Sequence, residues 1–249
     1  MSSKLILPGE AIPLPSSSKS IILGPGIAAS SSRTRTLPSS DDASSSTNPT
    51  IIATRLGVLG SSKGKEKSEQ IWVEGNSKRY IPAQKDMVLG TIIARHAEGY
   101  RVDLGSAQMA SLEALAFEGA TKRSKPNLKV GTLVYARVSL ANRDMEPEIE
   151  CFDPNTGKSE GFGELKGGLM ITCSLQLCRQ LLTPKFPLLP TLAASIPFEI
   201  AVGLNGRVWF KAGTVSETVT LKRIVEGVDN GEIRAERSAV EQAVKEYLA

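Results

Sequence analysis

The stretch V-L-G-T-I-I-A-R-H-A-E-G-Y-R-V-D-L-G, from Val88 to Gly105, decides the fold of the middle of the chain. Its first half, Val88–His96, is rich in β-branched residues and predicts a strand. Glu98-Gly99 predicts a turn, and Tyr100–Gly105 alternates between apolar and polar residues in the way that is typical of a half-buried strand. The stretch therefore predicts two neighbouring strands joined by a tight turn.

Three more short strands are predicted downstream, and with the first two they indicate a closed barrel. They lie at Ala107–Ser111, Val130–Ser139 and Glu148–Phe152. Five short strands in succession are typical of the five-stranded oligonucleotide-binding (OB) barrel. We therefore predict an OB-fold domain over residues 87–153.

Residues 1–86 predict a small, all-β N-terminal domain with one long loop. Short apolar pieces are separated by Pro8-Gly9 and by Gly24-Pro25-Gly26, which favour turns. The segment Ala28–Thr50 is dominated by Ser, Thr, Pro and Asp and cannot bury enough apolar surface to offset the entropy lost on ordering. We therefore predict a disordered surface loop over residues 28–50.

Residues 154–249 predict a small α+β domain, because helical periodicity appears beside short strands. The predicted elements, in chain order, are a strand at Leu169–Cys173, a helix capped by Ser174 and stopped by Pro184, strands at Phe198–Val202 and Arg207–Lys211 around Gly203–Gly206, a helix from Ser216 to Gly227, and a helix over Ile233–Leu248. The whole chain is thus predicted to be multi-domain, mainly β with α+β.

The sequence offers little that could support catalysis. His96 is the only histidine, it is predicted to lie mid-strand, and no acidic or nucleophilic motif lies beside it. Cys173 and Cys178 have no His or Cys partner at metal-ligand spacing. We therefore interpret them as small apolar side chains buried in the core. There is also no G-x-x-x-x-G-K-[ST] phosphate loop. We predict a noncatalytic protein without metal or cofactor, and the weaker alternative is a hydrolase that uses His96.

Composition also favours an intracellular location. The three cysteines form no even disulfide framework, which suggests a reducing compartment. No apolar run is long enough for a transmembrane helix. Pro8 and Gly9 interrupt the start of the chain before a signal-peptide core could form.

One basic cluster gives the clearest indication of a partner. The net charge is only +4, but T-K-R-S-K-P-N-L-K, from Thr121 to Lys129, has no acid between Glu118 and Asp144. Its cations are Lys122, Arg123, Lys125 and Lys129. The cluster lies in the long connection before the fourth barrel strand, and nucleic acid tends to lie along the mouth loops of an OB barrel. The alternative is an ordinary solvated loop.

These pieces together resemble a known family. Val88–Phe152 resembles an S1-type RNA-binding domain, with V-L-G-T-I-I-A, Y-R-V-D-L-G and V-G-T-L-V-Y-A-R-V in that family's order. Residues 154–249 resemble a divergent KH domain with the motif G-x-N-G at Gly203–Gly206, followed by R-V-W. P-G-E at Pro8–Glu10 and L-G-P-G at Leu23–Gly26 resemble the N-terminal domain of the same proteins. The combination resembles the cap subunits of the eukaryotic RNA exosome.

The resemblance implies a noncatalytic function in a large assembly. Its implied partners are RNase PH-like ring subunits, other cap subunits, single-stranded RNA and associated 3′–5′ exoribonucleases, with no membrane. The subunit would stabilise the ring and guide RNA into its channel for processing and degradation. The implied location is nucleus, nucleolus and cytoplasm. The alternative is a free-standing S1/KH protein that acts in translation or in RNA metabolism outside the exosome.

The resemblance also assigns candidate site residues. RNA contact is expected at Tyr100, Arg101 and the four cations of the basic cluster, with Tyr100 as the one plausible stacking platform. The G-x-N-G motif is expected to be structural, because Asn205-Gly206 favours a type I′ hairpin turn. Gly203 belongs to the same turn, and Trp209 is expected to be a packing anchor.

Overall fold

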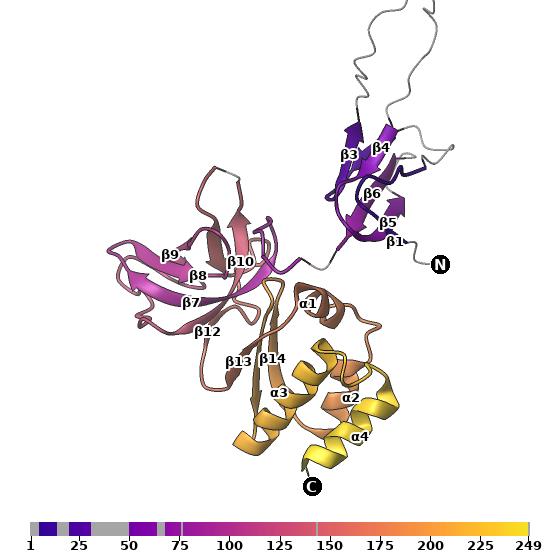
Figure 1. Cartoon of the computed structure of the whole chain (residues 1–249). Helices are drawn as coiled ribbons and strands as arrows, with labels where there is room; N and C mark the ends of the chain where they lie inside the picture. The colour runs from indigo at the N-terminus through magenta and orange to yellow at the C-terminus, as the bar shows by residue number, and fades with distance from the viewer. Residues whose placement is uncertain are drawn as a thin grey trace, which may run out of the picture. The chain divides into compact units, whose positions relative to one another are not determined.

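The computed structural model describes residues 5–13, 20–30, 50–63, 68–75, 77–142 and 144–248. The chain divides into two compact units, Met1–Asn76 and Ser77–Ala249 (Figure 1). Residues 77–86, which the sequence analysis assigned to the N-terminal domain, lie in the second unit, where Tyr80 packs into the barrel core. In the described part of the chain, no helix has the length and apolar character needed to cross a bilayer.

The described residues of the N-terminal unit form strands and connecting turns. One sheet has the strand order β1-β5-β6-β2, and β3 pairs with β4 in a separate hairpin. The bounds are β1 Leu5–Ile6, β2 Ser20–Leu23, β3 Ile27–Ser30, β4 Thr50–Ala53, β5 Gly57–Lys63 and β6 Ser68–Glu74. The apolar core of this unit is formed by Ile6, Ile12, Ile51, Ala53 and Val73.

The predicted disordered segment, residues 28–50, is partly ordered at its two ends. Ser30 pairs with Thr50 at the last register position of the β3–β4 hairpin. Burial of Ile51 on this hairpin compensates for the weak strand propensity of the neighbouring small residues. Residues 31–49 lie outside the described residues.

The first part of the second unit is the predicted five-stranded barrel. The order β11-β9-β8-β7-β10 is closed by a further pairing of β11 with β10, and β12 continues the sheet beyond β10. The bounds are β7 Met87–Arg95, β8 Gly99–Asp103, β9 Ala110–Phe117, β10 Leu133–Leu140, β11 Glu148–Cys151 and β12 Gly163–Leu165. A Cβ at Gly90 would lie 2.2 Å from Val102 Cγ1, so the glycine of V-L-G-T makes room for a core side chain of β8.

The third barrel strand lies further along the chain than predicted. Instead of Ala107–Ser111, β9 covers Ala110–Phe117, in the segment A-S-L-E-A-L-A-F. Alanine has a low intrinsic strand propensity, so the local pattern did not predict a strand in this alanine-rich segment. Pairing with β8 and β11 fixes it as a strand, and Ala110, Leu112 and Ala114 are buried in the barrel.

The second part of this unit is the predicted α+β domain. A three-stranded sheet, β13-β15-β14, packs one face against the helices. The bounds are β13 Leu169–Thr172, α1 Leu175–Leu181, α2 Leu188–Ser195, β14 Phe198–Gly203, β15 Arg207–Ala212, α3 Val215–Asp229 and α4 Arg237–Leu248. Val208 and Phe210 of β15 are fully or almost fully buried in this second core.

The first two helices of this domain show how capping residues and proline set helix positions. The predicted cap at Ser174 is confirmed, because its Oγ accepts a hydrogen bond from the N–H of Leu177 at 3.1 Å. Helix α2 was not among the predicted elements. Pro187 is the N-cap residue and Pro190 lies in the first turn, where a proline removes no intrahelical hydrogen bond.

Both later helices differ from prediction at their ends. Helix α3 is capped by Thr214 rather than Ser216, since Thr214 and Glu217 form a reciprocal capping box. It continues through Gly227, where a Cβ would lie 2.7 Å from Ile233 Cδ1. Helix α4 begins at Arg237 rather than at Ile233.

Candidate nucleic-acid interface

The G-L-N-G segment forms the turn of the β14–β15 hairpin, as predicted, but with a different turn geometry. Gly203 pairs with Arg207, which leaves a three-residue loop at 204–206. Gly206 has φ +78°, whereas Asn205 is not among the residues with positive φ. The predicted type I′ turn is therefore wrong, since that turn needs positive φ at both central positions. A three-residue loop with glycine in the left-handed region is the alternative hairpin solution.

Asn205 turns this hairpin loop into a contact between the two domains of the second unit. Its side chain is 7% exposed, and its Oδ1 accepts a hydrogen bond from the N–H of Leu89 at 3.1 Å. Its Nδ2 donates to the carbonyl oxygens of Leu89 and Leu104 at 2.7 and 2.9 Å. One buried amide thus satisfies three backbone groups of the barrel.

Arg207 continues the same contact. Its Nη2 lies 2.6 Å from Asp103 Oδ2, and its Nη1 donates to the Asp103 carbonyl oxygen at 2.7 Å. Partial burial opposes ionisation of Asp103, but hydrogen bonds from Arg207 and from the N–H of Gly105 lower the pKa of this carboxyl below its usual value. The N–H of Leu204 donates to the Met87 carbonyl at 2.8 Å. We call this set of contacts the junction.

Gly203 is needed for the close approach at the junction, and Gly206 for the close approach to Cys173 of the same domain. A Cβ at Gly203 would lie 2.3 Å from Asn205 Oδ1 and 2.8 Å from the backbone nitrogen of Leu89. A Cβ at Gly206 would lie 2.9 Å from the Cys173 carbonyl, in a backbone conformation that already favours glycine. The motif therefore packs against protein backbone rather than presenting free N–H groups to a phosphate.

Trp209 anchors the neighbouring face of β15. Its side chain is 4% exposed, and its Nε1 donates to the Gly167 carbonyl at 2.8 Å. It forms a small apolar cluster with Leu89 of the barrel and Ala201 of β14. The expected packing anchor is thus found within the chain, across the junction.

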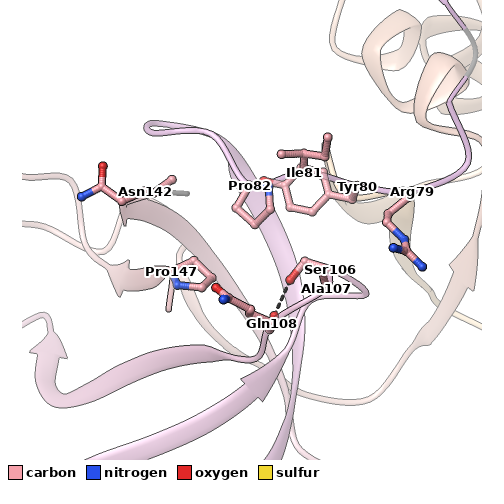
Figure 2. Close-up of a pocket in the computed structure, with 10 residues that line it drawn as sticks. Arg79, Tyr80, Ile81, Pro82, Ser106, Ala107, Gln108, Asn142 and Pro147 are labelled. Atoms are coloured by element: carbon pink, nitrogen blue, oxygen red, sulfur yellow. Dashed lines mark hydrogen bonds between the residues drawn. The ribbon is translucent and has the colours of Figure 1, made fainter. Parts of the chain in front are cut away.

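A pocket lies where the segment before β7 passes the barrel loops (Figure 2). Its volume is about 380 Å³, and its lining includes Tyr80, Pro82 and Pro147. The Tyr80 hydroxyl donates to Asp86 at 2.9 Å, and burial followed by the nearby Asp86 charge raises the pKa of Tyr80. Tyr80 therefore remains neutral and fixed in position at physiological pH.

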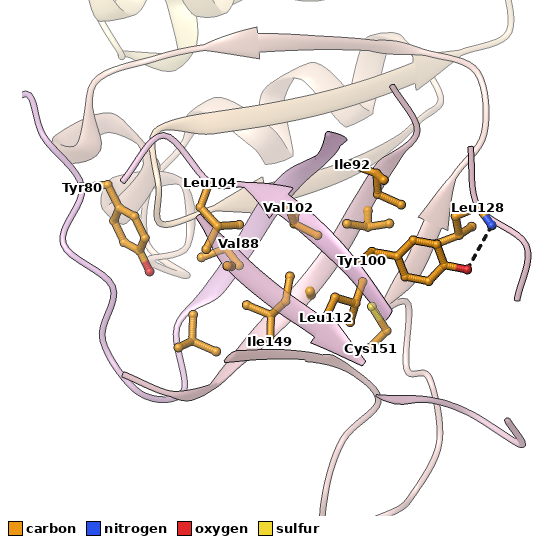
Figure 3. Close-up of a cluster of buried hydrophobic side chains, with 14 of the residues drawn as sticks. Tyr80, Val88, Ile92, Tyr100, Val102, Leu104, Leu112, Leu128, Ile149 and Cys151 are labelled. Atoms are coloured by element: carbon orange, nitrogen blue, oxygen red, sulfur yellow. Dashed lines mark hydrogen bonds between the residues drawn. The ribbon is translucent and has the colours of Figure 1, made fainter. Parts of the chain in front are cut away.

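Tyr100 lies in the barrel core and not on a nucleic-acid platform (Figure 3). It is 4% exposed, its hydroxyl donates to the Pro126 carbonyl, and it accepts from the N–H of Leu128 at 3.3 Å. The prediction that Tyr100 stacks on bases is therefore wrong. Strand alternation places it inward, and the tyrosine instead tethers the basic loop to the barrel.

Arg101 is exposed on the outside of β8, as its place beside Tyr100 in an alternating strand requires. Its Nη2 lies 2.7 Å from Glu146 Oε1, and both side chains are about half exposed. The predicted RNA contact of Arg101 would therefore have to compete with this ion pair.

The four predicted cations lie together on the loop between β9 and β10. Lys122, Arg123, Lys125 and Lys129 are all exposed, and none forms an ion pair with a residue in the described ranges. We call residues 118–132 the basic loop. Arg95, at the end of β7, donates to Asn127 of this loop. Arg95 and Tyr100 thus fix the loop at Asn127 and Leu128, while its cations face solvent.

The residues considered for catalysis do not form a site. His96 is exposed just after β7 rather than in mid-strand. Burial raises the pKa of Cys151, and that of Cys178, to about 12, so both thiols stay protonated at neutral pH. Within the described ranges, no three His, Cys, Asp or Glu residues are grouped as a metal ion would require.

Most of the junction was not identified from the sequence. The G-x-N-G motif was recognised, but the contact of Asn205 with Leu89 and the ion pair of Arg207 with Asp103 were not. Each of these contacts joins residues that are more than 100 positions apart in the sequence. The one sequence feature that could have indicated the junction is Arg207, two positions after the motif residue Asn205.

The geometry defines a class of protein in which a closed OB barrel and a KH-like domain are locked together. Comparison with known families assigns both domains and the N-terminal unit. "Exosome complex component RRP40, S1 domain" matches residues 80–163, "KH domain" matches 168–216, and "Exosome complex exonuclease Rrp40 N-terminal domain" matches 21–79.

Curated relatives match along most of their length. The Schizosaccharomyces pombe "Exosome complex component rrp40" is 51% identical over 217 residues, covering 86% of this chain and 83% of the relative. The Saccharomyces cerevisiae "Exosome complex component RRP40" is 38% identical over 250 residues, covering 99% and 98%. The chain therefore belongs to the exosome complex component RRP40 family.

A solved crystal structure shares the fold. It is of an RNA-binding protein assigned to an exosome complex, it covers 68% of this chain and 97% of its own, and the TM-score is 0.58 at 20% identity. At this identity the likeness supports the fold alone.

Proposed function

We propose that this chain is a noncatalytic, RNA-binding cap subunit of the RNA exosome. In this function it stabilises a ring of RNase PH-like subunits and guides single-stranded RNA into the channel, where associated nucleases degrade or process it from 3′ to 5′. The main support for this proposal is the similarity to the Saccharomyces cerevisiae exosome component over 98% of that relative's length. The proposed location is nucleus, nucleolus and cytoplasm.

The basic loop supports the RNA-binding part of this proposal. Its four exposed cations have no acidic partner in the described residues, so their charge is available to phosphates. Tyr100 is buried and cannot supply a stacking face there. Binding through this loop would therefore depend on backbone charge, with strong salt dependence and little sequence preference.

The junction supports the scaffold part. Because Asn205 and Arg207 connect the two domains of the second unit by hydrogen bonds and an ion pair, we expect the barrel and the KH domain to keep a fixed relative position. A subunit that holds neighbours at fixed positions benefits from such rigidity, since less conformational entropy is lost on assembly.

Assembly is tested by affinity purification of the tagged chain from native extract, followed by size-exclusion chromatography. We expect elution at the mass of a multi-subunit complex, with RNase PH-like subunits and a 3′–5′ exonuclease present. Elution near the mass of the isolated chain, without these partners, would contradict the proposal and favour a free-standing RNA-binding protein.

RNA guidance is tested by reversing the charge of Lys122, Arg123 and Lys125 to Glu. Each lost phosphate contact should lower the salt dependence of binding by about 0.7 in the slope of log K against log salt, or by about two for the three. The matched control reverses Lys185, Arg234 and Lys245, which are also exposed cations. Equal RNA affinity of both triple variants at low salt would count against the loop.

The absence of catalysis is tested with the purified chain and a 3′-labelled single-stranded RNA in the presence of Mg²⁺. We expect the RNA to remain intact, and His96→Ala to leave the function of the assembled complex unchanged. Shortening of the RNA by the purified chain that His96→Ala abolishes would support the hydrolase alternative.

A further inference from the structure

We propose that the pocket in Figure 2 binds one nucleobase of a single-stranded RNA. The inference rests on the proposed RNA-binding function and deepens it, because it names a place where a base is held rather than a phosphate. The basic loop contributes charge, whereas this pocket contributes a contact with the base itself. We call it the base pocket.

The lining of the base pocket is mainly apolar. Its solvent-accessible apolar part includes Ile81, Pro82 and Ala107, which lie beside the Tyr80 ring and Pro147 (Figure 2). Pro147 is buried, and Tyr80 is 5% exposed with its hydroxyl held by Asp86. Tyr80 and Pro147 therefore form a fixed floor, and the face of a base can pack against the exposed Ile81 and the half-buried Pro82 above it.

Two carboxamides at the edge of the pocket fit the edge of a base. Gln108 and Asn142 both line the space, and both are exposed. The Gln108 side chain makes no hydrogen bond among the described residues, and Asn142 makes only a 3.8 Å contact from Nδ2 to Met145 Sδ. An amide carries a donor and an acceptor in one plane, as the edges of bases do.

The exposed amides of Gln108 and Asn142 favour a base over an aliphatic side chain of a protein partner. A volume of about 380 Å³ admits either. An aliphatic group would cover both carboxamides without replacing the hydrogen bonds they make to water, which is unfavourable. A base instead replaces those bonds, so polar complementarity selects the occupant.

Charge around the pocket is compatible with RNA. Arg79 lies on the lining, where its guanidinium can contact a phosphate next to the bound base. Among the described residues, Arg79 on the lining forms no ion pair, and Glu146, which precedes the lining residue Pro147, is paired with Arg101.

The base pocket and the basic loop lie at opposite ends of β7. Gln84, just before β7, bonds to Ser139 near the pocket, whereas Arg95 at the other end bonds to the basic loop. The nine residues of β7 span about 30 Å. One RNA strand of several nucleotides can therefore reach both sites, which agrees with the 4–16 nucleotides that an OB fold typically covers.

The test uses the full-length chain and fluorescently labelled 12-nucleotide probes of oligo(A), oligo(U) and an abasic ribose-phosphate chain. Ala107 is exposed on the pocket lining, so Ala107→Trp fills the pocket without disturbing the core. Ala194→Trp, at an exposed position on α2, is the matched control. We expect the native chain to bind the base-bearing probes about tenfold tighter than the abasic probe. Ala107→Trp should reduce their affinity to the abasic level and leave abasic binding unchanged.

A second variant tests the polar edge. Gln108→Leu should weaken binding of the base-bearing probes and leave abasic binding unchanged, because the apolar wall remains while one hydrogen-bonding edge is lost. Equal affinity of this variant and the native chain for every probe would contradict the polar edge.

The outcomes separate this inference from the proposed function. Equal binding of the abasic and base-bearing probes, with no effect of Ala107→Trp on any of them, overturns the base pocket even if the basic-loop variant weakens binding. Loss of a copurifying protein in Ala107→Trp, with RNA affinity unchanged, overturns it in favour of a protein-docking site. Absence of salt-dependent binding to every probe contradicts the proposed RNA-binding function itself.

Discussion

The junction and the basic loop both present polar side chains at the barrel, but they use them in opposite ways. At the junction, Asn205 and Arg207 direct their polar groups at barrel backbone and at Asp103, with little exposure. In the basic loop, four cations face solvent without acidic partners among the described residues. Satisfied polar groups stabilise the fold, whereas unsatisfied charges remain available for a partner. Within the second unit, the junction thus stabilises the fold, whereas the basic loop is available to bind a partner.

The largest effect on stability is expected from the apolar side of the junction. Trp209→Ala should destabilise the second unit by about 4 kcal/mol, because a buried aromatic side chain and its packing on Leu89 are lost. Urea unfolding followed by circular dichroism measures this change. Phe152→Ala, at a half-buried ring outside the core clusters, serves as a control that should cost clearly less. Equal losses would show that Trp209 is no special anchor.

The second largest effect on stability is expected from the polar side of the junction. Asn205→Ala removes three hydrogen bonds to buried backbone groups of Leu89 and Leu104, and of these groups the Leu89 carbonyl keeps a 3.4 Å bond from Arg207 Nη1, so we expect a loss of about 3 kcal/mol. Asn155→Ala, in an exposed turn, should change stability by less than about 0.5 kcal/mol. RNA affinity of the folded Asn205→Ala protein should match that of the native chain. A selective loss of RNA binding with unchanged unfolding would instead indicate that the motif contacts RNA.

A smaller, pH-dependent effect is expected from Arg207→Ala. The folded-state pKa of Asp103 lies below its unfolded value, so its contribution is present above about pH 4. That contribution is lost as the pH falls through the folded-state pKa. The stability difference between native chain and variant should therefore be about 2 kcal/mol at pH 7 and should shrink below pH 4. Unfolding curves at pH 7, 5 and 3 test this, and a difference that stays constant with pH would contradict the ion pair.

The smallest stability effect is expected in the basic loop. Reversing Lys122, Arg123 and Lys125 should change the free energy of unfolding by less than about 0.5 kcal/mol, since these side chains are exposed. Thermal unfolding of this variant beside the native chain is the measurement. A large destabilisation would place the loop with the junction as an architectural element and remove the contrast between them.

The fold could be predicted where local patterns agree with tertiary packing. Alternation gave the strands around Val88 and Tyr100, and Ser174 marked the start of α1. The pattern failed where packing overrides propensity, as in the alanine-rich β9 and the proline-containing α2. The resemblance to S1-type domains assigned Tyr100 to a binding face, and alternation could not correct this because it does not say which face of a strand is inward.

Site residues divide in the same way. The basic loop could be found from the sequence because its charge is local and contiguous, from Lys122 to Lys129. The base pocket could not, because Pro82, Gln108 and Asn142 come from three separate segments.

By itself, the sequence determined the domain types, the hairpin at Gly203–Gly206 and the position of the basic loop, since each depends on neighbouring residues. Only the tertiary structure decided what the G-L-N-G motif does, because its partners Leu89 and Leu104 lie more than 100 residues away. Hydrogen bonds at that separation depend on how the two domains pack, and no local pattern encodes them. The motif that identifies the KH domain is therefore the element that fastens it to the barrel.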